Sequence, residues 1–406
     1  MSMITYTEAR LAVLLLPLAL SSAALGATPA SVSLSDATAA QSLTYMPAEI
    51  AGPMLFASGL KAPTKVILTP AGKLLVAEAG DGANSGRVSI IDRAGVRRTL
   101  LDGLPAGFDR RHRPSGPSGL DLKGRTLYIS IGEGDGLADV LRNGVVPVPR
   151  PSSPILSAVL SVRLAPGYED LDEGFVLQRL DHDILAHGSD VVLRNGQGAE
   201  ARVSLVTDIP NFIIDPERGI LGANPFGIAH DGERLYVVDP GLNRVWTVDP
   251  SIGSVPTFAE LAPVVNPPGI FPHFVNPVPT NIHKYGTSFL VSLFADYPFA
   301  MGGTEVRKLD LRGGTETSFI AGLSTAVDAL AVAIAGGHTQ FFVLEYSTNM
   351  KAGAPGRLLV YVSRKAAPQV LVDGLDGPMS VAVNAATGDV FVVNNRTGDI
   401  IRTQVR

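Results

Sequence analysis

Short runs of apolar residues, each bounded by glycine, proline or aspartate, recur along the chain. The clearest example, Asn224 to Asp249, reads NPFGIAHDGERLYVVDPGLNRVWTVD and predicts three short strands. Asp231 and Gly232 form a tight hairpin signal after the first strand, and Pro240 with Gly241 ends the second. A sheet of this size cannot bury both of its faces alone, so it requires neighbouring sheets.

The phrase of the second strand recurs six times. Its copies are KLLVAEAG (73–80), TLYISIGE (126–133), RLYVVDPG (234–241), SFLVSLFA (288–295), QFFVLEYS (340–347) and DVFVVNNR (389–396). A proline stands just before the first strand in every copy except the fifth, which has Val327: Pro63, Pro117, Pro225, Pro279 and Pro378. A repeat of about 50 residues with four strands is typical of a β-propeller blade. We therefore predict an all-β fold, a six-bladed β-propeller.

The two ends of the chain complement each other. The sixth copy stops after its third strand, at DIIRTQVR (399–406). The phrase that it lacks closes other copies, as in TLLDGL (99–104) or VLVDGL (370–375), and a similar phrase, MLFASGL (54–60), opens the repeat region. We predict that this N-terminal strand completes the last blade, because an open ring would leave an unpaired strand edge.

The step from Pro117 to Pro225 is twice the step from Pro63 to Pro117, although it contains one copy of the phrase. We interpret the excess as an insertion at 165–200 in blade two. Its apolar residues come near helical spacing, which permits a short helix: Leu171, Phe175, Leu180 and Ile184.

The N-terminus predicts export. Residues 1–27 resemble a secretory signal peptide, because the apolar core Leu11–Leu20 is shorter than the roughly 20 residues that a membrane span needs. An uncleaved anchor is the alternative interpretation. Residues 28–50, rich in Ala, Ser and Thr, predict a flexible linker before the propeller at 51–406. We expect a periplasmic or secreted monomer with no membrane attachment after signal cleavage.

The composition of the chain excludes several kinds of function. A net charge of −5 gives no electrostatic reason to expect a nucleic-acid partner, and the absence of cysteine excludes disulfides and thiolate chemistry. No GxSxG elbow, HExxH helix or P-loop is present. His230, His273 and His283 are scattered among predicted turns, where a histidine most often lies at the surface or serves as a hydrogen-bond partner.

Two columns of the aligned repeat carry polar oxygens. The first ends the second strand: Glu78, Ile131, Asp239, Leu293, Glu345 and Asn394. For any single residue we favour a turn-capping role, in which the side chain accepts backbone N–H groups. The alternative is that several of these side chains face a common ion or ligand.

The second column precedes or begins the first strand, which we expect to line the central channel: Thr64, Ser118, Asn224, Thr280, Asn281 and Asp328. Thr64, Ser118, Thr280 and Asn281 are the candidate ligand-binding residues. Ca²⁺ takes six to eight oxygen ligands, so a single divalent cation such as Ca²⁺ would require the candidate metal ligands Asn224, Asp328, Glu78 and Glu345. Because Asp328 is the sole carboxylate in this column, we do not expect tight binding.

Several phrases resemble a known family. They are NPFGIAHDGERLYVVDPGLNRV, VPTNIHKYGTSFLVSLFADYPFAMGGTEV, GLSTAVDALAV and GRLLVYV with GLDGPMSVAV. The region 52–406 is similar to the propeller proteins associated with scytonemin biosynthesis clusters (ScyD/ScyE-like), and more distantly to NHL-repeat and gluconolactonase-like propellers. The most specific part is DYPF (296–299). The resemblance implies an exported six-bladed propeller without an established reaction, and the insertion at 165–200 is longer than it implies.

Two functional hypotheses follow. The first is a non-catalytic propeller that binds a small molecule or a protein partner at its channel mouth or loops. The second is a metal-dependent lactonase or hydrolase, which the gluconolactonase-like resemblance implies, with a cation polarising a carbonyl and a carboxylate acting as base. The sequence assigns no catalytic residue.

Overall fold

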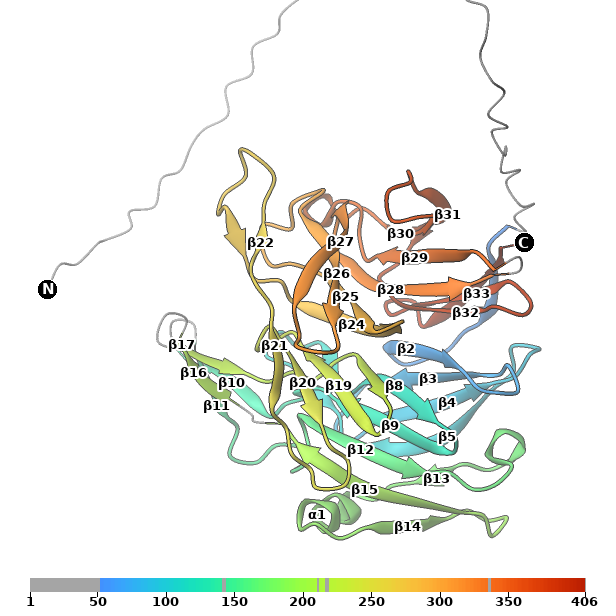
Figure 1. Cartoon of the computed structure of the whole chain (residues 1–406). Helices are drawn as coiled ribbons and strands as arrows, with labels where there is room; N and C mark the ends of the chain where they lie inside the picture. Colours follow the sequence, from blue (N-terminus) through green and yellow to red (C-terminus); the bar gives the residue numbers. More distant parts are fainter. Residues whose placement is uncertain (1–51, 141–143, 210–211, 216–218, 335–336, 406) are drawn as a thin grey trace, which may run out of the picture. The chain divides into compact units, whose positions relative to one another are not determined.

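The computed structural model describes residues 52–140, 144–209, 212–215, 219–334 and 337–405. The predicted signal peptide (1–27) and linker (28–50) lie outside these residues. The described chain forms six antiparallel sheets that follow one another as the blades of a β-propeller (Figure 1). This confirms the predicted fold class. None of the helices in the described part is long and apolar enough to cross a bilayer.

Blades 1 to 3 each run from an inner strand to an outer strand. Blade 1 contains β2 (Pro63–Leu68), β3 (Leu74–Glu78), β4 (Gly86–Ile91) and β5 (Arg97–Leu104). Blade 2 contains β8 (Pro117–Lys123), β9 (Thr126–Ile131), β12 (Ala158–Arg163) and β15 (Glu200–Asp208). Blade 3 contains β18 (Ile228–Asp231), β19 (Arg234–Asp239), β20 (Arg244–Val248) and β21 (Thr257–Glu260).

Blades 4 to 6 repeat this order. Blade 4 contains β24 (Pro279–Tyr285), β25 (Ser288–Leu293), β26 (Thr304–Asp310) and β27 (Glu316–Leu323). Blade 5 contains β28 (Ala326–Ala333), β29 (Thr339–Glu345), β30 (Gly356–Tyr361) and β31 (Gln369–Leu375). Blade 6 contains β32 (Pro378–Asn384), β33 (Asp389–Asn394), β34 (Asp399–Gln404) and the N-terminal strand β1 (Met54–Ala57).

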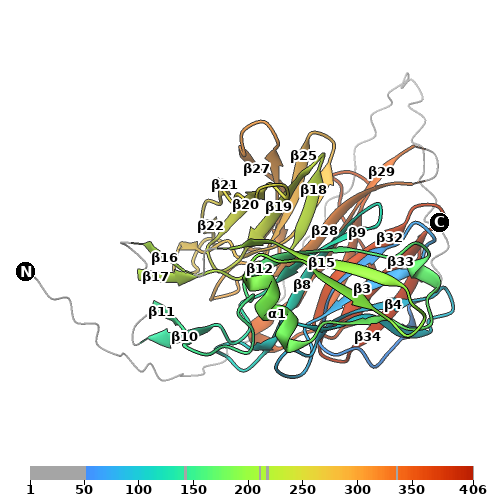
Figure 2. The same cartoon turned by 90° about the horizontal axis from the view of Figure 1, so that it is seen from below.

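Short ribbons and 3₁₀ helices occupy the connections. The ribbons are β6 (Gly107–Phe108) with β7 (Pro114–Ser115), β10 (Leu137–Val140) with β11 (Gly144–Pro147), β16 (Phe212–Asp215) with β17 (Gly219–Gly222), and β22 (Val264–Val265) with β23 (Phe274–Val275). The 3₁₀ helices are η1 (Tyr168–Asp170) and η2 (Met350–Ala352). Strand β11 contacts β17, so the second and third ribbons lie side by side (Figure 2).

The first strand closes the ring as predicted. Strand β1 pairs antiparallel with β34, with Met54 opposite Arg402 and Leu55 opposite Ile401. The ring of Phe56 lies 5.0 Å from that of Phe391 in β33, which is on the other side of β34 in the same sheet. The outer edge of β34 is therefore paired, and the sheet of blade 6 reaches four strands, as in blades 3, 4 and 5.

The insertion adds a strand to each of two blades. Strand β13 (Phe175–Val176) pairs parallel with β5, and β14 (Val191–Arg194) pairs antiparallel with β15. Between them lies α1 (Arg179–Ala186), which begins with a capping box between Gln178 and Asp181. The permitted helix is thus present, but its buried side carries His182 and Leu185, whereas Leu180 and Ile184 are exposed.

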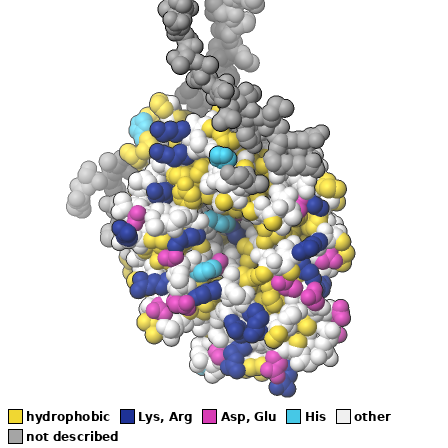
Figure 3. Space-filling view, turned by 45° about the vertical axis from the view of Figure 1, so that its right-hand side comes forward, with side chains coloured by type: hydrophobic (Ala, Val, Ile, Leu, Met, Phe, Trp, Pro, Cys, Tyr) yellow, Lys and Arg dark blue, Asp and Glu magenta, His cyan; other side chains and the backbone are white. Residues whose placement is uncertain are grey.

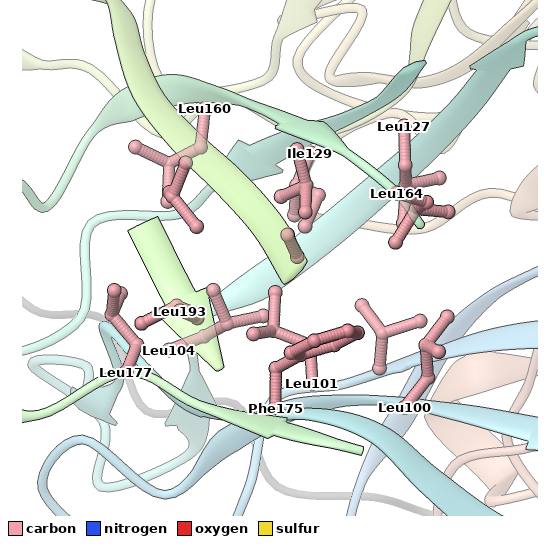
Figure 4. Close-up of a cluster of buried hydrophobic side chains, with 14 of the residues drawn as sticks. Leu100, Leu101, Leu104, Leu127, Ile129, Leu160, Leu164, Phe175, Leu177 and Leu193 are labelled. Carbon is pink, nitrogen blue, oxygen red and sulfur yellow. The ribbon is translucent and has the colours of Figure 1, made fainter. Parts of the chain in front are cut away.

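The largest apolar cluster lies between blades 1 and 2, because each sheet has an apolar face toward its neighbour. Leu100 and Leu101 from β5 face Leu160 from β12 and Ile129 from β9, and Phe175 from β13 lies among them (Figure 4). The insertion therefore completes the packing of two blades.

Candidate ligand-binding site in the central channel

In five of the six blades, a bulge at the start of the inner strand decides which residue faces the channel. The pairing shifts there directly after the residue at the proline position, for example between Pro63 and Lys65. In blade 5 this residue is Ala326, opposite Glu345, and not Val327 as predicted from the sequence. A bulge inserts an extra residue and re-aims the side chains that follow it. The equivalent positions two residues after the proline position are Lys65, Gly119, Gly227, Asn281, Asp328 and Ser380.

The two glycines of this set allow neighbouring inner strands to approach closely. A Cβ on Gly119 would lie 2.3 Å from the carbonyl oxygen of Phe226, and a Cβ on Gly227 would lie 2.7 Å from the Cα of Asn281. Both distances are shorter than van der Waals contact. A side chain is therefore excluded in blades 2 and 3, and polar side chains gather on the other four inner strands.

Asp328 is the centre of this polar cluster. Its Oδ2 accepts hydrogen bonds from Ser380 Oγ (2.8 Å), Val381 N (3.0 Å) and Lys65 Nζ (3.3 Å). Its Oδ1 lies 2.7 Å from His283 Nε2. Burial alone would raise the pKa of the Asp328 carboxyl, but Lys65, His283 and the Val381 N–H together hold that pKa well below its usual range. Asp328 is therefore a carboxylate that joins blade 5 to blades 1, 4 and 6.

Lys65 is fully buried, with a side chain 2% exposed. Its Nζ donates to Asn281 Oδ1 (2.9 Å) as well as to Asp328. Burial lowers the pKa of Lys65, and the Asp328 carboxylate opposes this shift. A buried ion pair of this kind costs desolvation energy, so removal of one partner leaves an uncompensated charge.

His283 lies between the carboxylate and the ammonium of this cluster. Its Nε2 is 2.7 Å from Asp328 Oδ1 and 3.1 Å from Lys65 Nζ. The ring therefore belongs to the same network as the buried ion pair.

A second histidine lies on the neighbouring blade. His230 Nδ1 is 2.5 Å from Asp121 Oδ2 on β8. The hydrogen bond to Asp121 raises the pKa of His230 above its usual value, against the lowering effect of burial. His230 therefore keeps its second proton, on Nε2, to a higher pH than an isolated imidazole.

Lys65, His230 and His283 line a cavity of about 330 Å³, which lies along the second halves of the inner strands. Its polar wall includes Lys65, Asp121, His230, His283 and Lys284, and its apolar wall includes Ile67, Leu120, Ile228 and Ile282. Histidine and basic side chains gather at a hollow in the middle of one face (Figure 3). This volume lies at the lower end of the range for ligand pockets, roughly 300–1,000 Å³.

The hydroxyl groups predicted to bind a ligand instead join successive blades. Thr64 Oγ1 donates to Pro117 O, Ser118 Oγ to Pro225 O and Thr280 Oγ1 to Val327 O, each over 2.8 Å. Among the four predicted ligand-binding residues, Asn281 is the one that shares the hydrogen-bond network of the channel. The bulge places the residue after each of Thr64, Ser118 and Thr280 at the channel position, and a ligand-binding role for these three hydroxyls stays a prediction.

The four predicted metal ligands lie in separate hydrogen-bond networks. Glu78 accepts from Lys61 N, Ser89 and Arg97, and Glu345 accepts from Ser324 N and Arg357. Asn224 Oδ1 accepts from Glu133 N, and Asp328 lies in the channel network. Within the described ranges no three His, Asp or Glu side chains are grouped so as to hold a metal ion. Glu78 and Glu345 have the capping role favoured from the sequence.

The sequence analysis missed Lys65, Asp121 and Ser380, and it placed His230 and His283 near turns rather than on inner strands. The alternation of the strand would have found His283, because it lies two residues after Asn281 on β24. His230 lies three residues after Gly227, so alternation alone does not indicate it. The sequence also indicated Lys65, because a lysine within a largely apolar strand is rarely buried without a charged partner.

Among known proteins, this chain is similar to solved structures. No protein-family model matches the sequence, and no curated protein matches it. Similar solved structures include a protein described as an oxidoreductase (glucose dehydrogenase) from Thermus thermophilus, with 15% identity, a TM-score of 0.47 and coverage of 86% of this chain and 99% of that chain.

Two further structures are similar to a comparable degree. The PQQ-bound aldose sugar dehydrogenase from Streptomyces coelicolor has 14% identity, a TM-score of 0.45 and coverage of 89% of this chain and 99% of that chain. A gluconolactonase from Xanthomonas campestris has 11% identity, a TM-score of 0.44 and coverage of 89% and 97%. These likenesses concern the fold alone, and the resemblance to the scytonemin-associated propellers stays a prediction.

Proposed function

We propose that this β-propeller binds a small polar organic molecule in the cavity of its central channel, and that it does so in the periplasm or outside the cell. The observation that carries the proposal is the cavity of about 330 Å³, in which charged and imidazole groups stand opposite an aliphatic wall. Ligand sites combine apolar walls with a few placed polar groups in this way. The nearly balanced charges of the polar wall favour a neutral ligand with several hydrogen-bonding groups.

The metal-dependent lactonase alternative fits the residues less well. A divalent cation at Asp328 would stand beside the Lys65 ammonium, whose Nζ is already 3.3 Å from the carboxylate. The other candidate ligands, Glu78 and Glu345, neutralise Arg97 and Arg357. Like charges repel strongly in a buried site, so this donor set does not suit a divalent ion.

Calorimetric titration and thermal shift with a panel of small polar compounds test the proposal. Sugars, polyols, hydroxy acids and amino acids form the panel, and EDTA is present throughout. We expect a ligand that raises the melting temperature of the native protein and loses affinity in His230→Ala and His283→Ala. The control His273→Ala removes an exposed histidine outside the cavity. Binding that survives both cavity substitutions, or that appears only after Ca²⁺ is added in excess of the EDTA, would contradict the proposed site.

A further inference from the structure

One end of the propeller carries the two-stranded ribbons. The inner strands begin at this end, so the connections between successive blades lie there, and β9, β25 and β29 end there because each runs antiparallel to its inner strand. Ribbons β10–β11 and β16–β17 and strand β22 project from the same side of the molecule in both cartoons (Figure 1, Figure 2). We call the described residues of 105–116, 132–157, 209–227, 261–278, 294–303 and 346–355 the ribbon face.

The exposed aromatic rings of the protein gather on the ribbon face. Among the residues that the structure describes, five Phe and Tyr side chains are exposed, and all five lie here: Phe108, Phe212, Phe271, Phe274 and Tyr297. They belong to four separate connections, namely the ribbons β6–β7, β16–β17 and β22–β23 and the loop after β25. An accumulation of exposed apolar side chains on one surface marks a binding surface.

The ribbon β22–β23 is apolar over an unusual length. The 20 residues 261–280 include no Lys, Arg, Asp or Glu. Phe271 and Phe274 are 71% and 64% exposed, and Val265 pairs with Phe274 across the ribbon. Directly opposite residues of an antiparallel pair share one face, so these two exposed side chains lie together. The ribbon can therefore enter an apolar medium without the cost of burying a charge.

Exposed cations accompany the aromatic rings. Arg111 lies in the β6–β7 ribbon and Arg150 follows β11, and neither side chain has an ion-pair or hydrogen-bond partner within the described ranges. The Nζ atom of Lys351, which is also exposed, lies 5.3 Å from the ring centre of Tyr297. These three positive charges are available to an anionic partner.

The carboxylates of the same connections are already engaged. Asp109 and Asp139 form ion pairs with arginines of the β6–β7 ribbon. Asp135 is half-buried and accepts hydrogen bonds from Ser152, and the half-buried Asp296 accepts one from the next backbone N–H. Among the side chains described on the ribbon face, the exposed charges without a partner are therefore positive.

The geometry points to an anionic lipid surface as the partner of the ribbon face. Aromatic rings favour the boundary between acyl chains and headgroups, and basic side chains near that boundary attract anionic headgroups. The ribbon tips enter this boundary while the blades stay in water, so the attachment is peripheral and reversible. The inference goes beyond the proposed ligand-binding function, and it departs from the sequence expectation of a protein without membrane attachment.

Other partners fit these features less well. In a two-fold contact between two ribbon faces, Arg111, Arg150 and Lys351 of one copy would approach those of the other, and like charges repel. The interface with another protein has a closely packed apolar core. The aromatic rings here belong to separate connections, which a fluid lipid surface accommodates without matching their shape.

A fluorescent label on the β22–β23 ribbon tests the inference at one site. The chain has no cysteine, so His273→Cys in the full chain supplies a single labelling site for a polarity-sensitive fluorophore and retains both phenylalanines. We expect its emission to shift to the blue with vesicles of phosphatidylcholine and phosphatidylglycerol, and far less with phosphatidylcholine alone. The control is a label at Ile252→Cys, in the exposed turn after β20 at the opposite end of blade 3, which should not respond.

Three results of this experiment would overturn the inference. The first is an unchanged label at 273, which would leave a protein as the partner. The second is an equal response to neutral vesicles or at position 252. The third is a shift that grows with protein concentration in the absence of vesicles, which would identify a second copy of the chain as the partner.

Vesicle co-sedimentation measures the contribution of each side chain. Phe271→Ser should lower the partition coefficient by about tenfold, the scale expected for withdrawing one phenylalanine side chain from an apolar phase. Arg111→Gln should lower it by about fivefold, and Ile252→Ser should leave it unchanged. All three positions are exposed, so melting temperatures equal to that of the native chain show that the fold is retained. Equal partition of native chain and variants would locate membrane binding outside the ribbon face and refute the inference.

Discussion

Asp328 holds three other blades through a single carboxylate. Each of its oxygens has a charged or hydrogen-bonding neighbour, and its side chain is fully buried. The arrangement serves the fold and the site together, because the same carboxylate that neutralises Lys65 also orients His283. Measuring the free energy of unfolding tests the contribution of Asp328 to the fold separately from its role in the site.

Breaking this pair at one partner should destabilise the protein strongly. We expect Lys65→Met or Asp328→Asn to lower the free energy of unfolding by about 3–5 kcal/mol, because each leaves a buried charge or polar group without its partner. The double variant should cost less than the sum of the two. Urea unfolding at pH 7 gives the three values. Lys61→Met, at an exposed ion pair with Asp81, should cost less than about 1 kcal/mol. Strictly additive losses would show that the pair is not coupled.

Glu133 predicts a pH dependence of stability. Burial raises its pKa from the ordinary 4.5 to about 7, and Arg110, whose Nε lies 3.7 Å from it, opposes the shift incompletely. For a carboxyl with a raised pKa, the fold is favoured while the group is neutral, and stability is lost as pH rises through the folded value. Glu133→Gln should therefore stabilise the protein by about 2 kcal/mol at pH 8 and have little effect at pH 4.

Urea unfolding of wild type and variant at both pH values checks this sign. Glu233→Gln is the control, because Glu233 is 92% exposed beside Lys123. A Glu133→Gln variant that is less stable than wild type at pH 8 would mean that Arg110 dominates over burial.

Individual site residues were harder to predict than strands because one bulge shifts the inward-facing position. Thr64 and Lys65 are adjacent in sequence, yet Thr64 bonds to the next blade and Lys65 enters the channel. Period-two alternation identifies two faces but does not say which face the bulge turns inward. The register was correct in four blades, where the second-strand end pairs with the predicted proline, as in Pro63 opposite Glu78. In blade 5, Glu345 pairs with Ala326 and not with the predicted Val327.

At the scale of elements, the long strands were predictable and the short ones were not. The second strands recur as apolar runs with clear turn signals, and their predicted ranges agree with β3, β9, β19, β25, β29 and β33. Strand β13 has two residues, Phe175 and Val176, so it is too short to show a periodic pattern of apolar residues. Its pairing with β5 depends on tertiary packing, so no local pattern in the sequence indicates it.

The packing of β13 can be tested at Phe175. Its side chain is 1% exposed among leucines of blades 1 and 2. Phe175→Ala should lower the free energy of unfolding by about 3–5 kcal/mol, because it removes apolar contacts and leaves a cavity. Hydrogen exchange should rise first in β13 and β14. The exposed neighbour Val176→Ala is the matched control. Equal effects of the two substitutions would show that the insertion does not stabilise the blades.

At the scale of the molecule, the ring is held by equivalent contacts that repeat from blade to blade. The hydroxyl bonds of Thr64, Ser118 and Thr280 each reach the following blade, and Asn395 Nδ2 donates to Pro63 O over 3.0 Å between blades 6 and 1. The closure was predictable because the last copy of the repeat lacks a phrase that the first residues supply. A blade that lacks a strand leaves an exposed sheet edge, so another segment of the chain is strongly constrained to supply that strand.

This constraint makes two truncations behave differently. A chain that begins at residue 52 retains β1 and should melt at the temperature of the full-length chain. A chain that begins at residue 61 lacks β1 and exposes the edge of β34. The shorter chain also loses Phe56, whose ring packs 5.0 Å from Phe391. It should melt several degrees lower, since each 1 kcal/mol lost shifts the melting temperature of a protein by roughly 2–4 °C at this scale. It should also associate through the free edge.

Addition of a synthetic peptide of residues 52–60 should restore the melting temperature and suppress association, because the edge accepts one antiparallel strand. If both truncated chains melt alike, the first strand does not close the propeller.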